Sequence, residues 1–316
     1  MFRLSCPYIF LFVLIALSGC DKPDDQQLQI PQFVSRQDQS FTLHNGQAVM
    51  TVSPQKGGRV SGLKMGNQEF LAKETQGNDK VNSYGSVLWS SPQSEWMWPP
   101  LAELNANPYS VSCTKDKTAI VLTSDIEPKT GYQFVKSYSL GEHSESFKMR
   151  YKIINHSDKT KNVAIIENTR VDPVGLVFFP KGDTEPNSGI FYPLEIKLLN
   201  GIVWHKFEPE KIRQDHHKVM MDGKAGWLAY QKGRYLLVKH FPDSPANRAP
   251  DTEREIEIFG HSDRTFAEIK HQSALHLLAP GESFEWEVVW QLKKIPDDAD
   301  LSLGSNDLVD VARAKD

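Results

Sequence analysis

Residues 147–153 read Phe147-Lys148-Met149-Arg150-Tyr151-Lys152-Ile153, a strict alternation of apolar and basic side chains. Side chains two residues apart in a strand point to the same side, so this pattern predicts a β-strand with one buried and one solvated face. Residues 284–292 predict a second such strand, in which one face carries Phe284, Trp286, Val288, Trp290 and Leu292. Strands of this kind are typical of antiparallel sheets that bury one face in a core.

Short apolar runs continue this pattern in both directions from residue 147. The predicted strands are 48–52, 60–65, 119–123, 132–140, 163–166, 227–230, 235–241, 254–259 and 266–271, with turns at Gly66-Asn67 and at 155–158. Helical periodicity is weak and confined to residues 301–314. The sequence therefore predicts an all-β protein, a large sandwich or barrel built as a single domain over residues 39–295. Residues 296–316 are polar, and we expect them to form a C-terminal tail.

The first twenty residues resemble a bacterial lipoprotein signal. Arg3 precedes an apolar stretch from Tyr8 to Leu17, and Leu17-Ser18-Gly19-Cys20 resembles a lipobox. This predicts a signal peptide over residues 1–19, lipid on Cys20 and a polar, flexible tether over residues 20–38. The protein would then be anchored to a membrane and face the periplasm in the bacterial cell envelope, and Asp21 favours the inner membrane.

The formal net charge of −4 argues against a nucleic-acid partner, because nucleic-acid binding calls for a basic patch or stripe. The sequence contains no glycine-rich phosphate loop and no nucleophile motif, and it predicts no cofactor. It does not indicate an oligomeric state.

Three segments, in this order, resemble galactose mutarotase-like proteins, the aldose 1-epimerase superfamily. The first is Ser53-Pro54-Gln55-Lys56-Gly57-Gly58-Arg59-Val60 with Gly66-Asn67-Gln68-Glu69-Phe70-Leu71, and the second is residues 151–159. The third comprises residues 266–270, 278–283 and 286–290. The resemblance spans residues 40–292 and is nearest to an uncharacterised branch of bacterial secreted proteins and lipoproteins. It implies a β-supersandwich whose concave face binds carbohydrate.

In mutarotases a glutamate on a late strand takes the proton of the anomeric hydroxyl, and a histidine on the central strand protonates the ring oxygen. Glu268 matches the position of the glutamate. The central strand departs from the family pattern, because Asn168 or Thr169 stands where the histidine is expected. An amide cannot donate a proton at neutral pH, which argues against epimerase activity. His205 and His240 are candidates for a relocated acid, with a satisfied histidine as the alternative for each.

Candidate sugar-binding residues follow from side-chain chemistry. Arg59 comes after Gly57-Gly58, which lets the backbone approach a ligand. Asn168 and Arg170 share one face of the central strand, and Lys218 and Lys239 can bind anionic sugars. The alternative for the two lysines and Arg59 is a solvated side chain. Glu268 has a similar alternative, a surface pair with Lys270.

The stretch 86–100 contains Trp89, Trp96 and Trp98 and ends in two prolines, which exclude a helix or central strand. We expect an ordered loop at the lip of the binding face, with Trp96 and Trp98 contacting sugar; a lid over the core is the alternative. His216 with His217, and His271 with His276, would point to opposite faces of a strand, so the sequence predicts no metal site.

Three functions remain open from the sequence. The first is a membrane-anchored lipoprotein whose mutarotase-like domain binds carbohydrate on its concave face. The second is an aldose 1-epimerase, an isomerase that uses Glu268 as its base. The third is a non-catalytic envelope scaffold. The sequence thus leaves open whether the protein is an enzyme.

Overall fold

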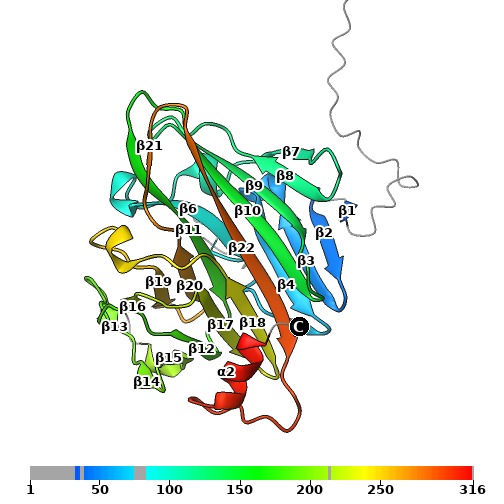
Figure 1. Ribbon diagram of the computed structural model, residues 1–316, viewed down its shortest axis with the longest axis vertical. Coiled ribbons are helices and arrows are strands. Elements are labelled where there is room, and N and C mark those ends of the chain that lie inside the picture. Colours follow the sequence, from blue (N-terminus) through cyan, green and yellow to red (C-terminus); the bar gives the residue numbers. More distant parts are fainter. Residues whose placement is uncertain (1–32, 36–38, 75–82, 213–214, 315–316) are drawn as a thin grey trace, which may run out of the picture.

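The computed structural model describes residues 33–35, 39–74, 83–212 and 215–314. These residues form two large sheets that pack face to face (Figure 1). Every strand pair is antiparallel except β13 with β16. The structure confirms the prediction of an all-β sandwich.

The larger sheet has twelve strands. Ten of them follow the order β1 (Phe33–Ser35), β2 (Phe41–Asn45), β3 (Ala48–Ser53), β4 (Arg59–Met65), β6 (Ser86–Ser91), β11 (Lys161–Val171), β20 (Ala267–Gln272), β19 (Ile256–Gly260), β16 (His217–Met221) and β13 (Tyr192–Pro193). The other two are β5 (Gln68–Glu69), which pairs with β4, and β21 (His276–Leu278), which pairs with β11.

The smaller sheet has ten strands in the order β14 (Lys197–Leu199), β15 (Ile202–Phe207), β12 (Gly175–Pro180), β17 (Trp227–Lys232), β18 (Tyr235–His240), β22 (Ser283–Lys294), β10 (Ser146–Asn155), β9 (Tyr132–Leu140), β8 (Ala119–Thr123) and β7 (Ser110–Cys113). The helices are α1 (Ala102–Asn105), α2 (Asn306–Arg313) and the single-turn η1 (Pro54–Lys56), η2 (Gln93–Glu95), η3 (Pro209–Lys211) and η4 (Ala246–Arg248).

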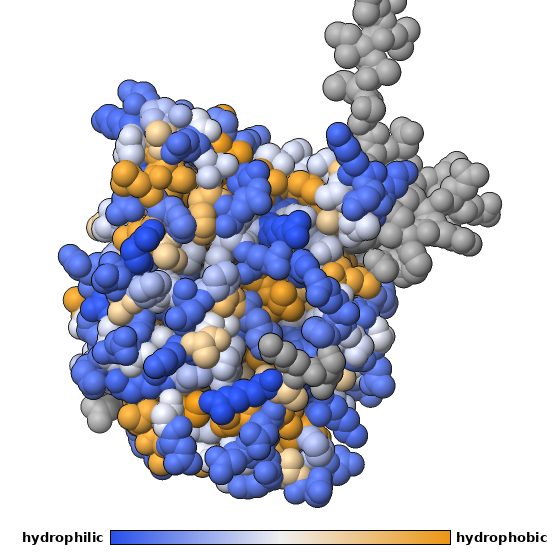
Figure 2. Space-filling view, viewed as in Figure 1, coloured by the Kyte–Doolittle hydropathy of each residue, from blue (hydrophilic) through white to orange (hydrophobic). Residues whose placement is uncertain are grey.

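The core lies between the two sheets, and the alternating strands place it there. In β10 the apolar positions of the alternation are at most 2% exposed, and Tyr151 lies opposite Trp286 of β22. The polar positions of the same strands face solvent, where Arg150 pairs with Glu287 at 2.9 Å. Figure 2 shows that hydrophilic side chains predominate on this outer face of the smaller sheet. The predicted amphipathic strands are therefore confirmed.

The C-terminal segment differs from the predicted polar tail. It forms α2, which packs on the outer face of the smaller sheet near β17 and β18 (Figure 1). Leu308, Val309 and Ala312 are buried there against a cluster that includes Phe178 and Trp204. The weak periodicity at 301–314 is thus the signature of a short amphipathic helix, whose polar face dominates the composition.

Replacing Leu308 by Ala is expected to lower the free energy of unfolding by about 2–5 kcal/mol, because Leu308 is fully buried between α2 and the outer face of the smaller sheet. Equilibrium unfolding in urea measures the change. Asp310→Ala on the exposed face of the same helix is the matched control and should change stability by no more than about 0.5 kcal/mol. Equal effects for both variants would contradict a packed α2.

The predictions for the N-terminus fall mostly outside the described residues. These include the signal peptide, Cys20, Asp21 and most of the predicted tether. Within that tether, residues 33–35 form β1, which pairs with β2. Within the described part of the chain, no helix is long and apolar enough to cross a membrane.

Candidate functional site

The face of the larger sheet that turns away from the smaller sheet carries a row of alternating charges. We call Lys218, Glu257, Lys270, Glu268 and Arg170 the charge ladder; they lie on the adjacent strands β16, β19, β20 and β11. Their strand neighbours, such as Ile258 and Ile269, point into the core between the sheets. The period of two in these strands therefore puts all five charges on the outer face.

Glu268 is held by three partners. Its Oε1 accepts hydrogen bonds from Asn168 Nδ2 at 3.1 Å and Arg170 Nε at 2.9 Å, and its Oε2 pairs with Lys270 Nζ at 3.0 Å. Burial acts to raise the pKa of Glu268, but the charges of Lys270 and Arg170 outweigh it and lower that pKa to about 2. Glu268 is therefore an ionised anchor for two cations, and its basicity is low.

Glu257 holds the other end of the ladder. Its two oxygens accept from Lys270 Nζ at 2.5 Å and Lys218 Nζ at 2.9 Å. Burial opposes ionisation of Glu257, yet these two ammonium groups lower its pKa. Burial likewise acts to lower the pKa of Lys270, but Glu257 and Glu268 outweigh it and raise that pKa. Lys270 and the two carboxylates that it bridges therefore carry full charge at neutral pH.

Three buried polar atoms around Lys270 have no hydrogen-bond partner within the described part of the chain. They are Nη1 of Arg170, Oδ1 of Asn168 and Nε2 of Gln272. All three side chains stand on β11 and β20 and are at most 3% exposed. Gln272 and Lys270 also line a small hollow, together with Gln93, Glu253 and Glu257. Buried polar groups normally have partners, so these atoms are suited to a polar ligand.

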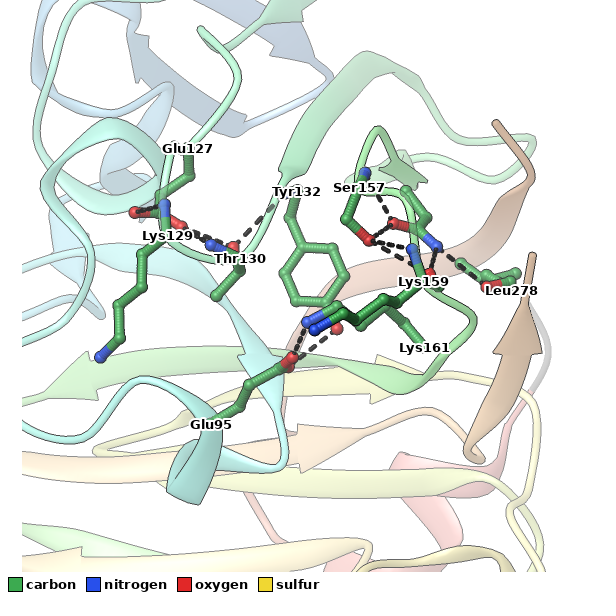
Figure 3. A network of polar contacts seen from close by, with 10 residues as sticks. Glu95, Glu127, Lys129, Thr130, Tyr132, Ser157, Lys159, Lys161 and Leu278 are labelled. Carbon is green, nitrogen blue, oxygen red and sulfur yellow. Dashed lines mark hydrogen bonds and ion pairs between the residues drawn. The ribbon is translucent and has the colours of Figure 1, made fainter. Parts of the chain in front are cut away.

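The tryptophan loop, residues 92–100, lies beside this hollow and is fixed at several points. Glu253 accepts from Ser91 Oγ at 2.5 Å and from the Gln93 amide at 2.6 Å. Glu95 accepts from Tyr132 Oη at 2.8 Å and pairs with Lys161, and Figure 3 shows both side chains converging on it. Residues 92–100 therefore form an ordered loop, as the sequence predicts. The prediction is wrong for residues 86–91, which form the central strand β6, because the prolines that end a strand begin only at Pro92.

The three tryptophans have different roles. Trp89 and Trp96 are buried in a small apolar cluster on the outer face of the larger sheet, and Trp96 Nε1 donates to the Ser90 carbonyl at 3.0 Å. Trp98 is 65% exposed and lies edge-on to Trp89, with the two ring centroids 6.3 Å apart. Trp96 is buried against the larger sheet, which agrees with the lid alternative, whereas Trp98 is exposed.

Arg59 and Lys239 are not part of the charge ladder, and both are fully buried. Arg59 Nη1 donates to the Tyr84 carbonyl at 2.5 Å, and Lys239 pairs with Glu167 at 2.6 Å between the two sheets. Gly57 has a φ of +74°, and a Cβ there would lie 2.1 Å from the Asn105 carbonyl oxygen. Gly57 thus accommodates neighbouring backbone, and Gly58 accommodates the side chains of Tyr109, Leu122 and Lys136.

The two candidate acids are not brought together with Glu268. His205 stands on β15 and faces the interior, where its Nδ1 lies 2.7 Å from the Glu195 carbonyl and burial lowers its pKa. His240 lies on β18, next to the inward-pointing Lys239. Both belong to the smaller sheet, so the larger sheet separates them from Glu268. Among the described residues, no group of three or more His, Cys, Asp or Glu side chains is placed to hold a metal ion.

Sequence reasoning selected Asn168, Arg170, Lys218 and Glu268 as candidates, and the structure puts all four on one face. It did not select Glu257, Lys270 and Gln272. Acidic residues alternate with other types over residues 253–257, and over residues 268–272 the polar residues Glu268, Lys270 and Gln272 alternate with Ile269 and His271. Polar residues at a period of two beside inward-facing isoleucines were the available signal for a functional face.

The stability of the wild type relative to Glu255→Gln is expected to fall as the pH rises from about 5 to about 8. Burial, and then the nearby charges of Asp243 and Asp222, raise the pKa of Glu255 to about 8 from the ordinary 4.5. The folded state therefore binds this proton more tightly than the unfolded state, which stabilises the fold at low pH. This stabilisation is lost as the pH rises and the proton leaves. The free energy of unfolding of the wild type, relative to that of the variant, falls by on the order of 1 kcal/mol per pH unit.

Urea unfolding of both proteins across this range measures the difference. The comparison relies on the slope and not on the absolute stability, because Glu255 accepts from two backbone amides, those of Ser244 and Gly223. The side-chain amide of the variant has a single acceptor oxygen and would mispair with one of them at every pH. Parallel stability curves for the two proteins would contradict the raised pKa.

The family described as "Domain of unknown function (DUF4380)" matches residues 39–293. A search of curated protein sequences finds no match. Among solved structures, a galactose mutarotase-like protein from Lactobacillus casei is similar over 80% of this chain and 100% of its own, with a TM-score of 0.54 and 11% identity.

Two further structures are similar. A galactose mutarotase related enzyme from Lactobacillus acidophilus has a TM-score of 0.54 and 12% identity, covering 83% of this chain and 100% of its own. A TPR-domain containing protein from Parabacteroides distasonis has a TM-score of 0.58 and 15% identity, covering 82% of this chain and 48% of its own. These likenesses show that the chain has the galactose mutarotase-like fold, as the sequence predicts.

Proposed function

The chain belongs to the DUF4380 family of domains of unknown function, and from that premise we propose that it is a carbohydrate-binding protein. The ligand lies on the outer face of the larger sheet, above the charge ladder. One observation carries the proposal: Arg170 Nη1, Asn168 Oδ1 and Gln272 Nε2 are buried on that face without partners in the described residues. A sugar hydroxyl both donates and accepts, so adjacent hydroxyls suit this mixture of two donors and one acceptor.

The surroundings support a sugar as the ligand. Rings of Trp89 and Phe266 flank the Arg170 guanidinium at 5.5 and 6.0 Å, and Trp98 is exposed beside them. Apolar faces of pyranose rings pack against aromatic side chains, while the hydroxyls reach the polar atoms between them. The Arg170 side chain is only 1% exposed, so a ligand that reaches Nη1 displaces part of this aromatic cover.

Catalysis by Glu268 is the less favoured function. An effective general base has a pKa near the working pH, and the pKa of Glu268 is about 2. Neither His205 nor His240 shares its face of the sheet. The geometry therefore favours binding over ring opening, and Glu268 is better suited to holding Arg170 and Lys270 in place.

A glycan array probed with the full chain in detergent tests the proposal, with tryptophan fluorescence titration of each positive glycan. Binding should change the fluorescence, because Trp89 and Trp98 cover the site. Silence on a broad array would overturn carbohydrate binding. Polarimetry of glucose, galactose and a uronic acid tests the alternative, with Glu268→Gln as control. Acceleration of anomer exchange that the control abolishes would establish the epimerase instead.

We also propose that the chain is lipidated on Cys20 and anchored to a membrane, facing the periplasm. The lipobox-like Leu17-Ser18-Gly19-Cys20 supports this, and Asp21 supports the inner membrane. Metabolic labelling with a clickable fatty acid should mark the wild type but not Cys20→Ala. Equal labelling of both proteins would exclude lipid on Cys20.

A further inference from the structure

A band of aromatic rings, interrupted by Lys270, crosses the outer face of the larger sheet. Trp98 contacts Trp89 at 6.3 Å, and Lys270 Nζ lies 5.0 Å from the Trp89 ring and 5.5 Å from the ring of Phe259. Phe259 in turn contacts Phe191 at 6.0 Å. Two aromatic platforms therefore lie on either side of one ammonium group.

The two platforms come from opposite parts of the chain and of the sheet. Trp89 stands on β6 and Trp98 in the loop that follows it, whereas Phe259 stands on β19 and Phe191 directly precedes β13. The strands from β6 through β11 and β20 to β19 are adjacent, so the first and last of them are about 14 Å apart. Trp98, which contacts Trp89, and Phe191, which contacts Phe259, form the two ends of the band. Lys270 on β20 stands between the two platforms, so a pyranose ring stacked on one platform does not cover the other.

The ends of the band are accessible and its centre is polar. Trp98 is 65% exposed, and Phe191 and Phe259 are half-buried. Between them, β11 and β20 carry the atoms of Arg170, Asn168 and Gln272 that lack partners in the described residues. At the far end, Lys218 Nζ lies 4.5 Å from the Phe191 ring, which adds a donor beside the second platform.

From this arrangement we infer that the ligand is a linear oligosaccharide that lies across the strands, rather than a monosaccharide. Its outer rings pack on Trp98 at one end and on Phe191 and Phe259 at the other, and an inner ring meets the polar atoms around Lys270. This inference rests on the proposed carbohydrate-binding function and specifies the size and direction of its ligand. Lys270 is neutralised by Glu257 and Glu268, so the band itself does not require a charged sugar.

Length series of linear glycans, neutral and uronic-acid-containing, test the inference on the full chain in detergent. Each series runs from the monosaccharide to about six residues, and titration calorimetry gives the affinity. We expect affinity to rise at least about tenfold from the monosaccharide to the trimer or tetramer and then to level off, as two stacking contacts are added. The arm that shows the rise also identifies whether the glycan is neutral or acidic.

Variants at the two ends make the test specific. Trp98→Ala and Phe191→Ala should each weaken binding of the longest glycan about threefold to tenfold, while binding of the monosaccharide changes little. Leu277→Ala, which removes another exposed apolar side chain outside the band, is the matched control and should bind like the wild type. Equal affinity for the monosaccharide and its oligomers would overturn the inference but leave carbohydrate binding intact. Binding of no glycan of any length would instead contradict the proposed function.

Discussion

Glu167→Ala is expected to lower the free energy of unfolding by about 3–5 kcal/mol, because it leaves a lysine ammonium buried without its counter-charge. Glu167 lies on β11 between the two sheets and is fully buried. Its Oε1 accepts from Lys239 Nζ at 2.6 Å and Trp290 Nε1 at 2.9 Å, and its Oε2 accepts from Tyr151 Oη at 2.7 Å. One substitution thus removes the acceptor for three buried donors.

The surrounding interior increases this cost. Arg59 and Lys136 are also fully buried, and Lys136 Nζ donates to the Gly57 carbonyl at 2.6 Å. Burial, and then the charge of Arg59, lower the pKa of Lys136 well below its ordinary value, while Glu167 acts in the opposite direction. Burial likewise lowers the pKa of Lys239, against the attraction of Glu167. Glu167 is therefore the carboxylate that opposes the loss of charge on both buried lysines.

Urea unfolding followed by tryptophan fluorescence measures the loss. Glu287→Ala is the matched control, because Glu287 pairs with the exposed Arg150 on the outer face and should cost less than about 1 kcal/mol. The double variant Glu167→Leu with Lys239→Met should recover much of the stability, since it removes both charges together. A cost for Glu167→Ala as small as that for Glu287→Ala would show that the interior does not depend on this pair.

The sequence predicted the sandwich well where strands are long and alternate regularly. Residues 119–123 and 132–140 match β8 and β9, and the strands at 147–153 and 284–292 lie within the adjacent β10 and β22. It missed β12 and β15 in the middle of the chain. The run Gly175–Pro180 is apolar throughout and ends in proline, so it shows no period of two. Periodicity cannot identify a short strand that is buried on both faces.

The candidate site was predictable only in part, because a period of two assigns residues to a face but does not say which face meets solvent. Asn168 and Arg170 were correctly grouped apart from Glu167 and Thr169. Which of these pairs points to the core depends on the packing of the second sheet, and here the inward pair includes a charged Glu167. Lys239 shows the same limit: a lysine is expected at the surface, yet this one has its partner on another strand 72 residues away.

Arg170→Met is expected to weaken glycan binding about 10-fold to 100-fold, which is the second large effect. Arg170 Nη1 is a buried charged donor without a partner in the described residues, and a hydrogen bond to such a group contributes about 1.5–3 kcal/mol. Methionine keeps much of the side-chain volume but offers no donor. The affinity is measured by titration calorimetry with the glycan that binds best on the array.

Two further variants separate binding from folding. Arg170 also holds Glu268, so its loss leaves that carboxylate with Lys270 and Asn168 alone, and the melting temperature of each variant must be compared with that of the wild type. Arg170→Lys keeps the charge but lacks the planar guanidinium group that reaches Glu268 and a ligand at once. Its affinity should therefore lie between those of the wild type and Arg170→Met. Arg150→Met, on the opposite outer face, should bind like the wild type. If a folded Arg170→Met protein bound within about threefold of the wild type, the ligand would not contact Nη1, and the site would have to lie elsewhere on the sandwich.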